Sequence, residues 1–231
     1  MMIMKIGVTK FPGTNNEQDV LRALSSFGVE GVLIYEKDAD KLKDLNALII
    51  AGGFSFGDYL RPGVIAAKTA IMQELPKFVE QGNFVIGICN GFQILCETGI
   101  LPGVLTTNRS TKFVSRWVYV KINKSNSVLL RNSENKIWRI PIAHFDGNYY
   151  ATNSQIIELK KKNQIALQYC DEKGVISEDS NPNGSVDNIA GITNKEGNVL
   201  GLMPHPERAS FNYLGSEDGR TIFQNLIEEL K

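Results

Sequence analysis

The 231-residue sequence has only two histidines and three cysteines, no excess of either charge, and no apolar run of membrane length. The cysteines are odd in number and show no paired spacing, which argues against a disulfide framework or a zinc site. Lysine plus arginine equals aspartate plus glutamate, 25 against 25, so no net field favours nucleic acid or an anionic membrane surface. The first residues lead into a strand pattern without a signal sequence. We therefore expect a cytoplasmic protein that recognises its partners by local contacts.

Internal repeats and low-complexity tracts are absent too, and the length suits one α/β domain over residues 1–231. Alternating patterns in the first half are typical of a parallel sheet covered by helices on both faces. Shorter strand candidates in the second half are expected to extend this sheet with antiparallel strands. The predicted strands are 3–8, 32–35, 48–51, 84–88, 117–122, 138–142, 165–169, 189–193 and 199–203. The first predicted helix begins at Asn15, which is followed by Gln18 as in a capping box. Three further helices are predicted at 64–80, 91–98 and 222–230.

Cys89 lies in Gly87-Ile88-Cys89-Asn90-Gly91, between a buried strand and the apolar face of a helix. A strand must therefore turn into a helix at Cys89, and the flanking glycines allow the sharp corner of a nucleophile elbow with cysteine in place of serine. A thiol at a helix N-terminus feels the positive end of the helix dipole, which favours the thiolate that attacks carbon. The alternative is a small buried cysteine at a strand end.

His205 and Glu207 occur in Met203-Pro204-His205-Pro206-Glu207. Pro206 favours an extended conformation of His205, so the side chains of His205 and Glu207 should project to the same side. The carboxylate could then orient the imidazole and raise its basicity, as a third group does in cysteine and serine hydrolases. The alternative is a loop histidine between two prolines. The other candidate for a general base is His144.

An apolar strand at 48–51 leads into a glycine-rich loop that starts with Gly52 and Gly53. These glycines allow backbone N–H groups to point inward together, as an oxyanion hole requires, with the N–H of Asn90 as a second donor. The spacing matches neither glycine pattern of nucleotide-binding loops. A flexible turn after a strand is the alternative. We expect the site at the carboxyl ends of the parallel strands.

These motifs resemble the triad, or class I, glutamine amidotransferases, which carry Gly-x-Cys-x-Gly and a distant His-x-Glu. The similarity is closer to one family, the glutaminase subunits of phosphoribosylformylglycinamidine synthases in purine biosynthesis, and it extends over nearly the whole sequence. It implies a flavodoxin-like fold with a mostly parallel central sheet, helices on both faces and an antiparallel extension. The segments that carry the resemblance are 12–15, 52–63, 89–93, 181–185, 203–209 and 215–220.

The resemblance implies a Cys-His-Glu triad acting on glutamine. Cys89 would attack the side-chain amide, His205 would manage the proton on the nucleophile and then on the leaving ammonia, and Glu207 would hold His205. Water would then hydrolyse the thioester and release glutamate. An inactive glutaminase-like scaffold is an alternative, against which the intact triad argues.

The same resemblance assigns the oxyanion hole to the N–H groups of Gly53 and Asn90, and it gives Gln93 a contact with bound glutamine. Ammonia would pass to a large synthetase subunit that activates formylglycinamide ribonucleotide with ATP and magnesium, assisted in some systems by a small bridging subunit. No cofactor or metal is expected in this chain itself. A free-standing cysteine hydrolase of peptides or γ-glutamyl compounds is a further alternative, against which the motifs at 61–63 and 181–183 argue.

Tyr59, Arg61 and the loop around His144 are candidates for a docking surface or for coupling to the partner. That loop departs from the family, which commonly has His-Gly-Glu-Gly-Arg where this chain has residues 144–148. A phenylalanine there is expected to bar the backbone conformation of the family's glycine. Asn16 stands where relatives often have cysteine, and we expect it to lie away from the triad. The lysines at 160–162 are expected to form a solvated turn, with an anion-binding patch as the alternative.

Overall fold

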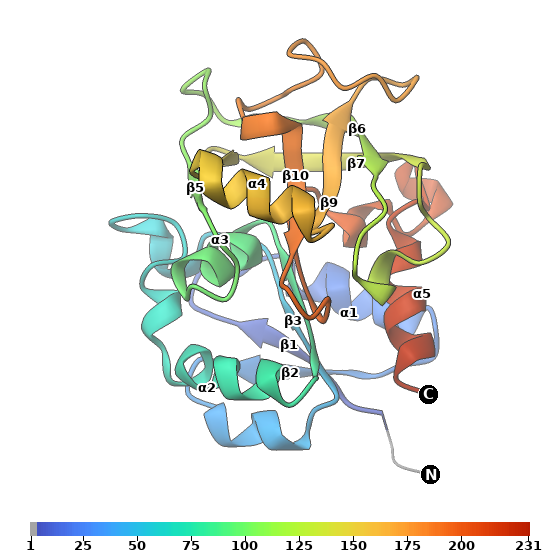
Figure 1. Ribbon diagram of the computed structural model, residues 1–231. Coiled ribbons are helices and arrows are strands. Elements are labelled where there is room, and N and C mark those ends of the chain that lie inside the picture. The colour runs from blue at the N-terminus through green and yellow to red at the C-terminus, as the bar shows by residue number, and fades with distance from the viewer. Residues whose placement is uncertain (1–3) are drawn as a thin grey trace.

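The computed structural model describes residues 4–231, and its centre is a nine-stranded sheet in the order β2-β1-β3-β4-β11-β10-β9-β6-β7 (Figure 1). Residue 3 of the first predicted strand lies outside the described residues. The strands of this sheet are β1 (Ile6–Lys10), β2 (Gly31–Tyr35), β3 (Ala47–Ile50), β4 (Phe84–Ile88), β6 (Val114–Ile122), β7 (Ile137–His144), β9 (Ile165–Cys170), β10 (Ile189–Thr193) and β11 (Val199–Leu202).

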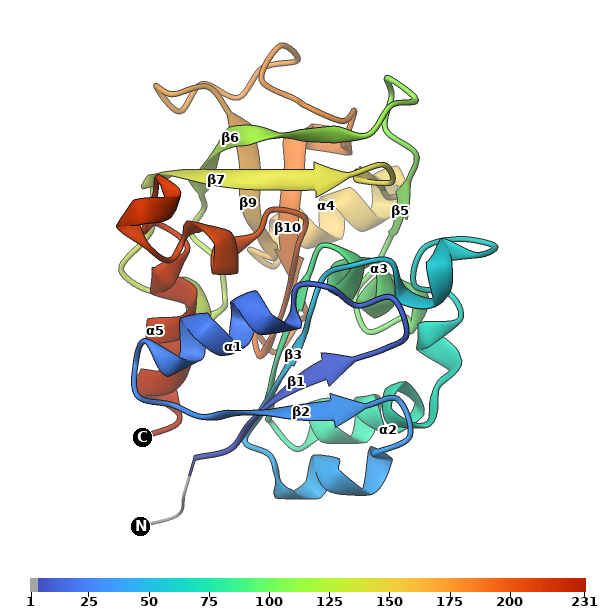
Figure 2. The ribbon, with the colours of Figure 1, turned by 180° about the vertical axis from the view of Figure 1, so that it is seen from behind.

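Five neighbouring strands, from β2 to β11, run parallel to one another. The inner strands β3 and β11 are buried along their whole length, because helices cover both faces of the sheet. Helices α1 (Glu17–Ser25) and α5 (Arg220–Glu229) lie on one face, and α2 (Ala70–Glu80), α3 (Asn90–Glu97) and α4 (Asn153–Lys161) lie on the other (Figures 1 and 2). The predicted α/β class with a mostly parallel central sheet is confirmed.

Strands β10, β9, β6 and β7 form the antiparallel extension that the sequence predicts. The prediction was wrong for β11, which is antiparallel to β10 but parallel to β4, with Leu202 beside Ile88. The hairpin from β10 returns the chain into the parallel part of the sheet. As a result, the segment after β11 leaves the sheet at the same edge as the segment after β4.

Local predictions failed in four places. The capping box of Asn15 and Gln18 does not form, since the N-cap of α1 is Asn16 and its side chain makes no capping hydrogen bond. The predicted helix at 64–80 begins only at Ala70, because Thr69 is extended and separates α2 from one 3₁₀ turn at Ala66–Lys68. The sequence patterns also missed α4 and the small sheet of β5 (Val104–Thr106) and β8 (Asn148–Tyr150).

The lysines at 160–162 belong largely to the end of α4 rather than to a separate turn. Lys160 pairs with Asp187 at 2.9 Å, and Lys162 pairs with Glu158 one turn earlier in the helix. Two of the three positive charges therefore have acidic partners. Within residues 4–231, no helix is both long and apolar enough to cross a membrane.

Candidate active site

Cys89 forms the corner between β4 and α3. Its backbone has φ 51° and ψ −105°, a conformation that costs a non-glycine residue about 1–3 kcal/mol. Three backbone hydrogen bonds hold the corner: the Cys89 N–H donates to Leu202 at 2.8 Å, and the Cys89 carbonyl accepts from Phe92 at 3.0 Å and Gln93 at 3.2 Å. The strain therefore falls on the predicted nucleophile itself.

Gly87 and Gly91 serve close packing rather than an unusual backbone conformation, since neither has a positive φ. A Cβ on Gly91 would lie 2.0 Å from the carbonyl oxygen of Ile50, and a Cβ on Gly87 would lie 2.7 Å from the carbonyl oxygen of Gly91. The two glycines let α3 approach β3 and β4 directly after the corner. The elbow forms as predicted, but for this different steric reason.

Cys89 and His205 meet beside Gly52, although the three residues come from distant parts of the sequence. A Cβ built on Gly52 would lie 3.2 Å from Cε1 of His205 and 3.4 Å from Cβ of Cys89. Both side chains are buried, with 5% and 2% of the residue surface exposed. The Cys89 thiol also lies 3.7 Å from the carbonyl oxygen of Ala143. The edge of the sheet after β3, β4 and β11 thus brings the thiol and the imidazole together.

His205 and Glu207 form a buried pair in which Nδ1 lies 2.6 Å from Oε1. His205 has the extended backbone that Pro206 favours. Burial opposes charge on the imidazole, but the interactions of the ring with Glu207 and Cys89 outweigh this effect and raise the pKa of His205 to about 10. Burial likewise opposes charge on Glu207, while the imidazolium of His205 holds the pKa of this carboxyl below its ordinary value.

Nε2 of His205 is buried and has no hydrogen-bond partner among the described residues. Because Nδ1 faces Glu207, the opposite nitrogen of the ring is the one available for proton exchange. A thiol beside such a nitrogen is the arrangement that general-base activation of a cysteine requires.

Asn16 contacts this pair directly, contrary to the prediction that it lies away from the triad. Its Nδ2 atom is 3.0 Å from Oε1 of Glu207 and 3.0 Å from Nδ1 of His205. The sequence contained no signal for this contact, because an asparagine before Glu17 is typical of a helix cap and its partners lie about 190 positions away.

Gly53 and Asn90 each have a backbone N–H that no protein acceptor takes among residues 4–231. Gly53 has φ 144°, and a Cβ there would lie 2.7 Å from the carbonyl oxygen of Gly13, so glycine is required at this position. The Asn90 side chain accepts from the Ser55 N–H at 3.1 Å and joins the glycine-rich loop to α3. Two free donors therefore flank the corner at Cys89.

Both the oxygen and the nitrogen of the Gln93 side-chain amide form hydrogen bonds within the protein. It accepts a hydrogen bond from Asn90 at 2.8 Å and donates one to the carbonyl of Asp146 at 2.7 Å. Nearby, burial and the charge of Asp146 raise the pKa of Asp58 to about 6. The structure thus places Gln93 between α3 and the loop that follows β7, and it adds Asp58 and Asp146, which motif analysis did not single out as site residues.

Phe145 does not have a positive φ, so the loop at 144–147 needs no left-handed residue at this position. Asn108 holds the loop closed by accepting the Gly147 N–H at 3.0 Å and donating to the His144 carbonyl at 3.0 Å. Burial and the nearby charge of His205 lower the pKa of His144 to about 4, so this imidazole is neutral at pH 7.

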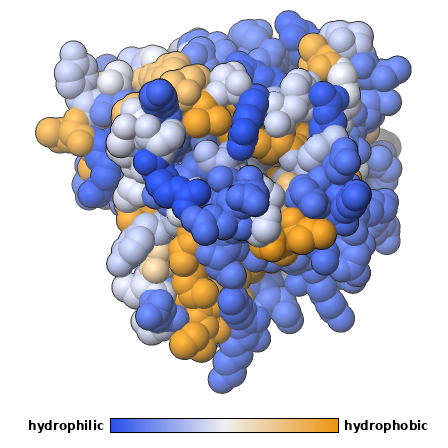
Figure 3. All heavy atoms as spheres, turned by 90° about the horizontal axis from the view of Figure 1, so that it is seen from above, coloured by the Kyte–Doolittle hydropathy of each residue, from blue (hydrophilic) through white to orange (hydrophobic). Residues whose placement is uncertain are grey.

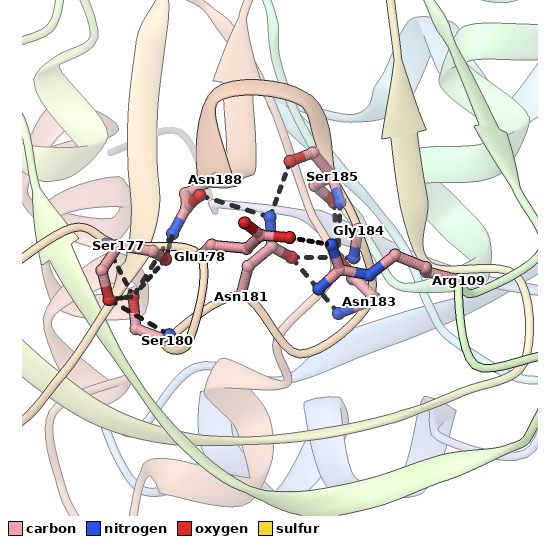
Figure 4. A network of polar contacts seen from close by, with 9 residues as sticks. All are labelled: Arg109, Ser177, Glu178, Ser180, Asn181, Asn183, Gly184, Ser185 and Asn188. Atoms are coloured by element: carbon pink, nitrogen blue, oxygen red, sulfur yellow. Dashed lines mark hydrogen bonds and ion pairs between the residues drawn. The ribbon is translucent and has the colours of Figure 1, made fainter.

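The motif at 181–185 forms a network of polar contacts with Arg109 and residues 177–188 (Figure 4), and it supports this loop. Asn181 accepts the Gly184 N–H at 2.8 Å, and the resulting turn lets the Asn183 side chain donate to the Gly147 carbonyl at 2.7 Å. Arg109 ties the turn down with a backbone hydrogen bond to Asn183 at 2.8 Å and an ion pair with Glu178 at 2.7 Å. The motif therefore supports the loop whose Asp146 carbonyl accepts the hydrogen bond of Gln93.

A hollow of about 540 Å³ between α2 and α4 contains no cysteine or histidine. No cluster of three or more histidine, cysteine, aspartate or glutamate side chains suited to a metal ion occurs within residues 4–231. The concentration of perturbed titratable groups marks the edge around Cys89 as the candidate active site.

Comparison with known families agrees with this geometry. A family model described as a CobB/CobQ-like glutamine amidotransferase domain matches residues 4–225. The match spans nearly the whole chain, so the protein belongs to the class of glutamine amidotransferases. Two curated relatives are phosphoribosylformylglycinamidine synthase subunits PurQ. The subunit of Aquifex aeolicus is 47% identical, with 98% of this chain and 100% of the relative covered, and that of Saccharolobus solfataricus is 50% identical, with 96% and 99% covered.

A solved structure gives the same assignment. A chain of PurLQS from Thermotoga maritima is 39% identical, superposes with a TM-score of 0.87 and is matched over 100% of both chains. The chain therefore belongs to the PurQ family of glutamine amidotransferases.

Proposed function

We propose that this chain hydrolyses glutamine to glutamate and ammonia and supplies the ammonia to a synthetase that makes formylglycinamidine ribonucleotide from formylglycinamide ribonucleotide. The proposed glutaminase domain spans residues 1–231. The observation that carries the proposal is the meeting of a strained Cys89 corner with the buried His205–Glu207 pair in a member of the PurQ family.

In the proposed first half-reaction, the Cys89 sulfur attacks the side-chain carbonyl carbon of glutamine. Nε2 of His205 takes the thiol proton and delivers it to the amide nitrogen, which leaves as ammonia when the C–N bond breaks. The product is a thioester on Cys89. Glu207 stabilises the imidazolium that exists between these proton transfers.

In the second half-reaction, water attacks the thioester carbon, and His205 takes the proton of the water and returns it to the departing sulfur. Glutamate leaves and the thiol is restored. Each tetrahedral oxyanion is proposed to accept hydrogen bonds from the N–H groups of Gly53 and Asn90, both free of protein acceptors in the described chain. The loss of one such donor typically lowers turnover by about two to three powers of ten.

We assign glutamine recognition to the surroundings of Gln93, where its side chain joins α3 to the loop at 144–147. Cys89 and His205 are almost completely buried, so glutamine must displace part of this covering to reach the thiol. The loop at 144–147 is the covering segment closest to Gln93, since the Asp146 carbonyl accepts directly from it.

We propose that the large synthetase subunit, with a small bridging subunit, docks near the same edge. Tyr59 and Leu60 are 74% and 92% exposed, and the next residue, Arg61, makes two hydrogen bonds to Glu97 on α3, at 2.7 and 2.6 Å. A partner that moves this loop would therefore also move α3, the helix that begins directly after Cys89. On the face seen in Figure 3, hydrophilic side chains surround the exposed apolar ones. ATP and magnesium are assigned to the synthetase, and the assembly is assigned to the cytoplasm, in keeping with three free cysteines.

The proposal is tested by measuring glutamine hydrolysis by the purified chain alone and mixed with its synthetase and bridging subunits. We expect hydrolysis to rise strongly in the mixture and a glutamine-mimicking alkylator to modify Cys89 alone. Labelling chiefly at Cys96 or Cys170, or activity on γ-glutamyl peptides that partners do not change, would contradict it. An unreactive Cys89 in an intact complex would also contradict it and would favour the inactive scaffold.

A further inference from the structure

Three polar atoms meet at the back of the His205 ring. Nδ1 of His205 lies 2.6 Å from Oε1 of Glu207, and Nδ2 of Asn16 lies 3.0 Å from each of these two atoms. All three side chains are buried, with 2% or less of each residue exposed. Water therefore does not screen these contacts, and each hydrogen-bond donor must face an acceptor.

When Glu207 is ionised, only one assignment of hydrogens satisfies both contacts to its Oε1 atom. A bare Nδ1 would set its lone pair against a carboxylate oxygen at 2.6 Å, so Nδ1 carries hydrogen and donates to Oε1. The 3.0 Å contact between Nδ1 and the Asn16 amide nitrogen then joins two donors and is not a hydrogen bond. Turning the amide round would instead place an oxygen 3.0 Å from Oε1. The Asn16 amide therefore donates to Glu207.

We propose that Asn16 is a positioning residue of the glutaminase site, which holds the Glu207 carboxylate by a second hydrogen bond and thereby keeps Nδ1 of His205 directed at Glu207 and Nε2 available to exchange a proton with Cys89. The inference rests on the proposed function and extends it to a residue outside the triad.

The carboxylate depends on few partners. Oε1 of Glu207 accepts from His205 and Asn16, whereas Oε2 has no hydrogen-bond partner in residues 4–231. Asn16 is thus the one neutral side chain that holds the carboxylate in place within this described region. Its hydrogen bond also helps to keep the pKa of Glu207 below the ordinary value against the effect of burial.

Asn16 itself is held on two sides. Its carbonyl accepts from the Val20 N–H at 3.2 Å and starts α1, and its N–H donates to the Gly52 carbonyl at 3.3 Å. As the N-cap of α1 it would ordinarily use its side chain to cap the helix, but it makes no such bond. The side chain instead donates to Glu207, so α1 lacks a side-chain cap. The backbone of Asn16, held by Gly52 of the glycine-rich loop, fixes the position of this donor.

The charged and titratable groups around the pair come from several elements. Cys89 at the start of α3 acts on His205, and His205 in turn helps to lower the pKa of His144 at the end of β7. Arg208 acts on Glu207 and pairs with Asp19 of α1 at 3.3 Å. None of these surrounding groups donates a hydrogen bond to the Glu207 carboxylate, so they cannot replace Asn16.

The test uses N16A, which removes the donor, and N16D, which keeps the shape but replaces the donor with a carboxyl group. In the complex with the synthetase, both should lower kcat about 10- to 100-fold at pH 8, the loss expected for one charge-assisted hydrogen bond. The KM for glutamine should change less than about twofold, because Asn16 acts on the base rather than on the substrate.

The pH dependence separates positioning from general damage. When protonated, the carboxyl group of N16D can donate to Glu207, whereas its ionised form repels it, and burial beside a carboxylate raises its pKa. The ratio of kcat for N16D to kcat for the wild type should therefore rise as the pH falls from 8 to 6. The corresponding ratio for N16A should stay constant.

The control is N225A, which removes a buried amide that donates to Leu129 and Arg131 at 2.9 and 3.1 Å, away from the site. Its kcat should stay within about twofold of wild type. Equal losses in N16A and N225A, a wild-type kcat in both Asn16 variants, or an N16D ratio that does not vary with pH would overturn the proposal.

A second measurement needs no glutamine. The rate at which iodoacetamide labels Cys89, followed by peptide mass spectrometry, should fall about tenfold in N16A and N16D at pH 8, because the base that activates the thiol is displaced. If wild-type complex does not hydrolyse glutamine, the proposed function fails, while these rates still test Asn16. Unchanged labelling rates in both variants would overturn the role of Asn16 whatever the glutaminase assay shows.

Discussion

A methyl group added at Gly52 should damage catalysis far more than folding. In G52A the new Cβ would lie 3.2 Å from Cε1 of His205, 3.4 Å from Cβ of Cys89 and 3.4 Å from the carbonyl oxygen of Ile88. Ordinary carbon contacts are nearer 3.5–4.0 Å, so the imidazole and the thiol must each move by a few tenths of an ångström. Gly52 does not have a positive φ, so alanine fits its backbone without strain.

The magnitude follows from these distances. A misplacement of 1 Å in a catalytic group can cost about 100-fold in rate, so a shift of a few tenths should lower kcat about 10-fold. Alanine restricts the unfolded chain and stabilises by about 0.4–1 kcal/mol at compatible sites, which offsets much of the crowding. The free energy of unfolding of G52A should therefore lie within about 1 kcal/mol of wild type.

The assay compares kcat for glutamine hydrolysis in the reconstituted complex with the free energy of unfolding of the chain alone. The control is G91A, whose Cβ would lie 2.0 Å from the backbone carbonyl of Ile50 and should destabilise the fold by several kcal/mol. G52A with wild-type kcat, or with a destabilisation as large as that of G91A, would refute the claim that the absence of a side chain at Gly52 lets the thiol and the imidazole take their catalytic positions.

Three further outcomes follow from the same site. In the wild type, the pKa of His205 is raised, so the stability contributed by its pair with Glu207 is present below pH 6.5 and is lost as the pH rises toward 10. The variant E207Q should flatten this part of the curve of unfolding free energy against pH. An unchanged slope would contradict the pairing. Burial and Asp146 raise the pKa of Asp58 to about 6, so between pH 4 and 6 the folded state holds a proton that the unfolded state has released. The free energy of unfolding should therefore fall from pH 4 to 6, and D58N should lessen this fall. Chemical denaturation at both pH values measures the difference. Leu60 is 92% exposed, so L60S should leave the unfolding free energy within about 0.5 kcal/mol of wild type. The same variant should weaken binding to the synthetase, measured by titration calorimetry. Undiminished binding would place the docking surface elsewhere.

Features that depend on neighbouring residues were predictable from the sequence. The apolar run before Cys89 and the helical pattern after it placed the corner correctly, because both elements are defined by local periodicity. The spacing of His205 and Glu207 around Pro206 likewise predicted that the two side chains would meet. The alternation of strands and helices was enough for the α/β class.

The tertiary structure alone decided how these local pieces combine. The parallel pairing of β11 with β4 brings His205 to the edge that carries Cys89, and no pattern within residues 199–203 distinguishes this direction from an antiparallel one. Asn16 is the clearest case, because its local context is that of a helix cap, whereas its partners are about 190 residues away. A side chain forms its bonds with whatever the complete fold places beside it. Local periodicity determines which elements form, and long-range packing determines which polar atoms share a buried space.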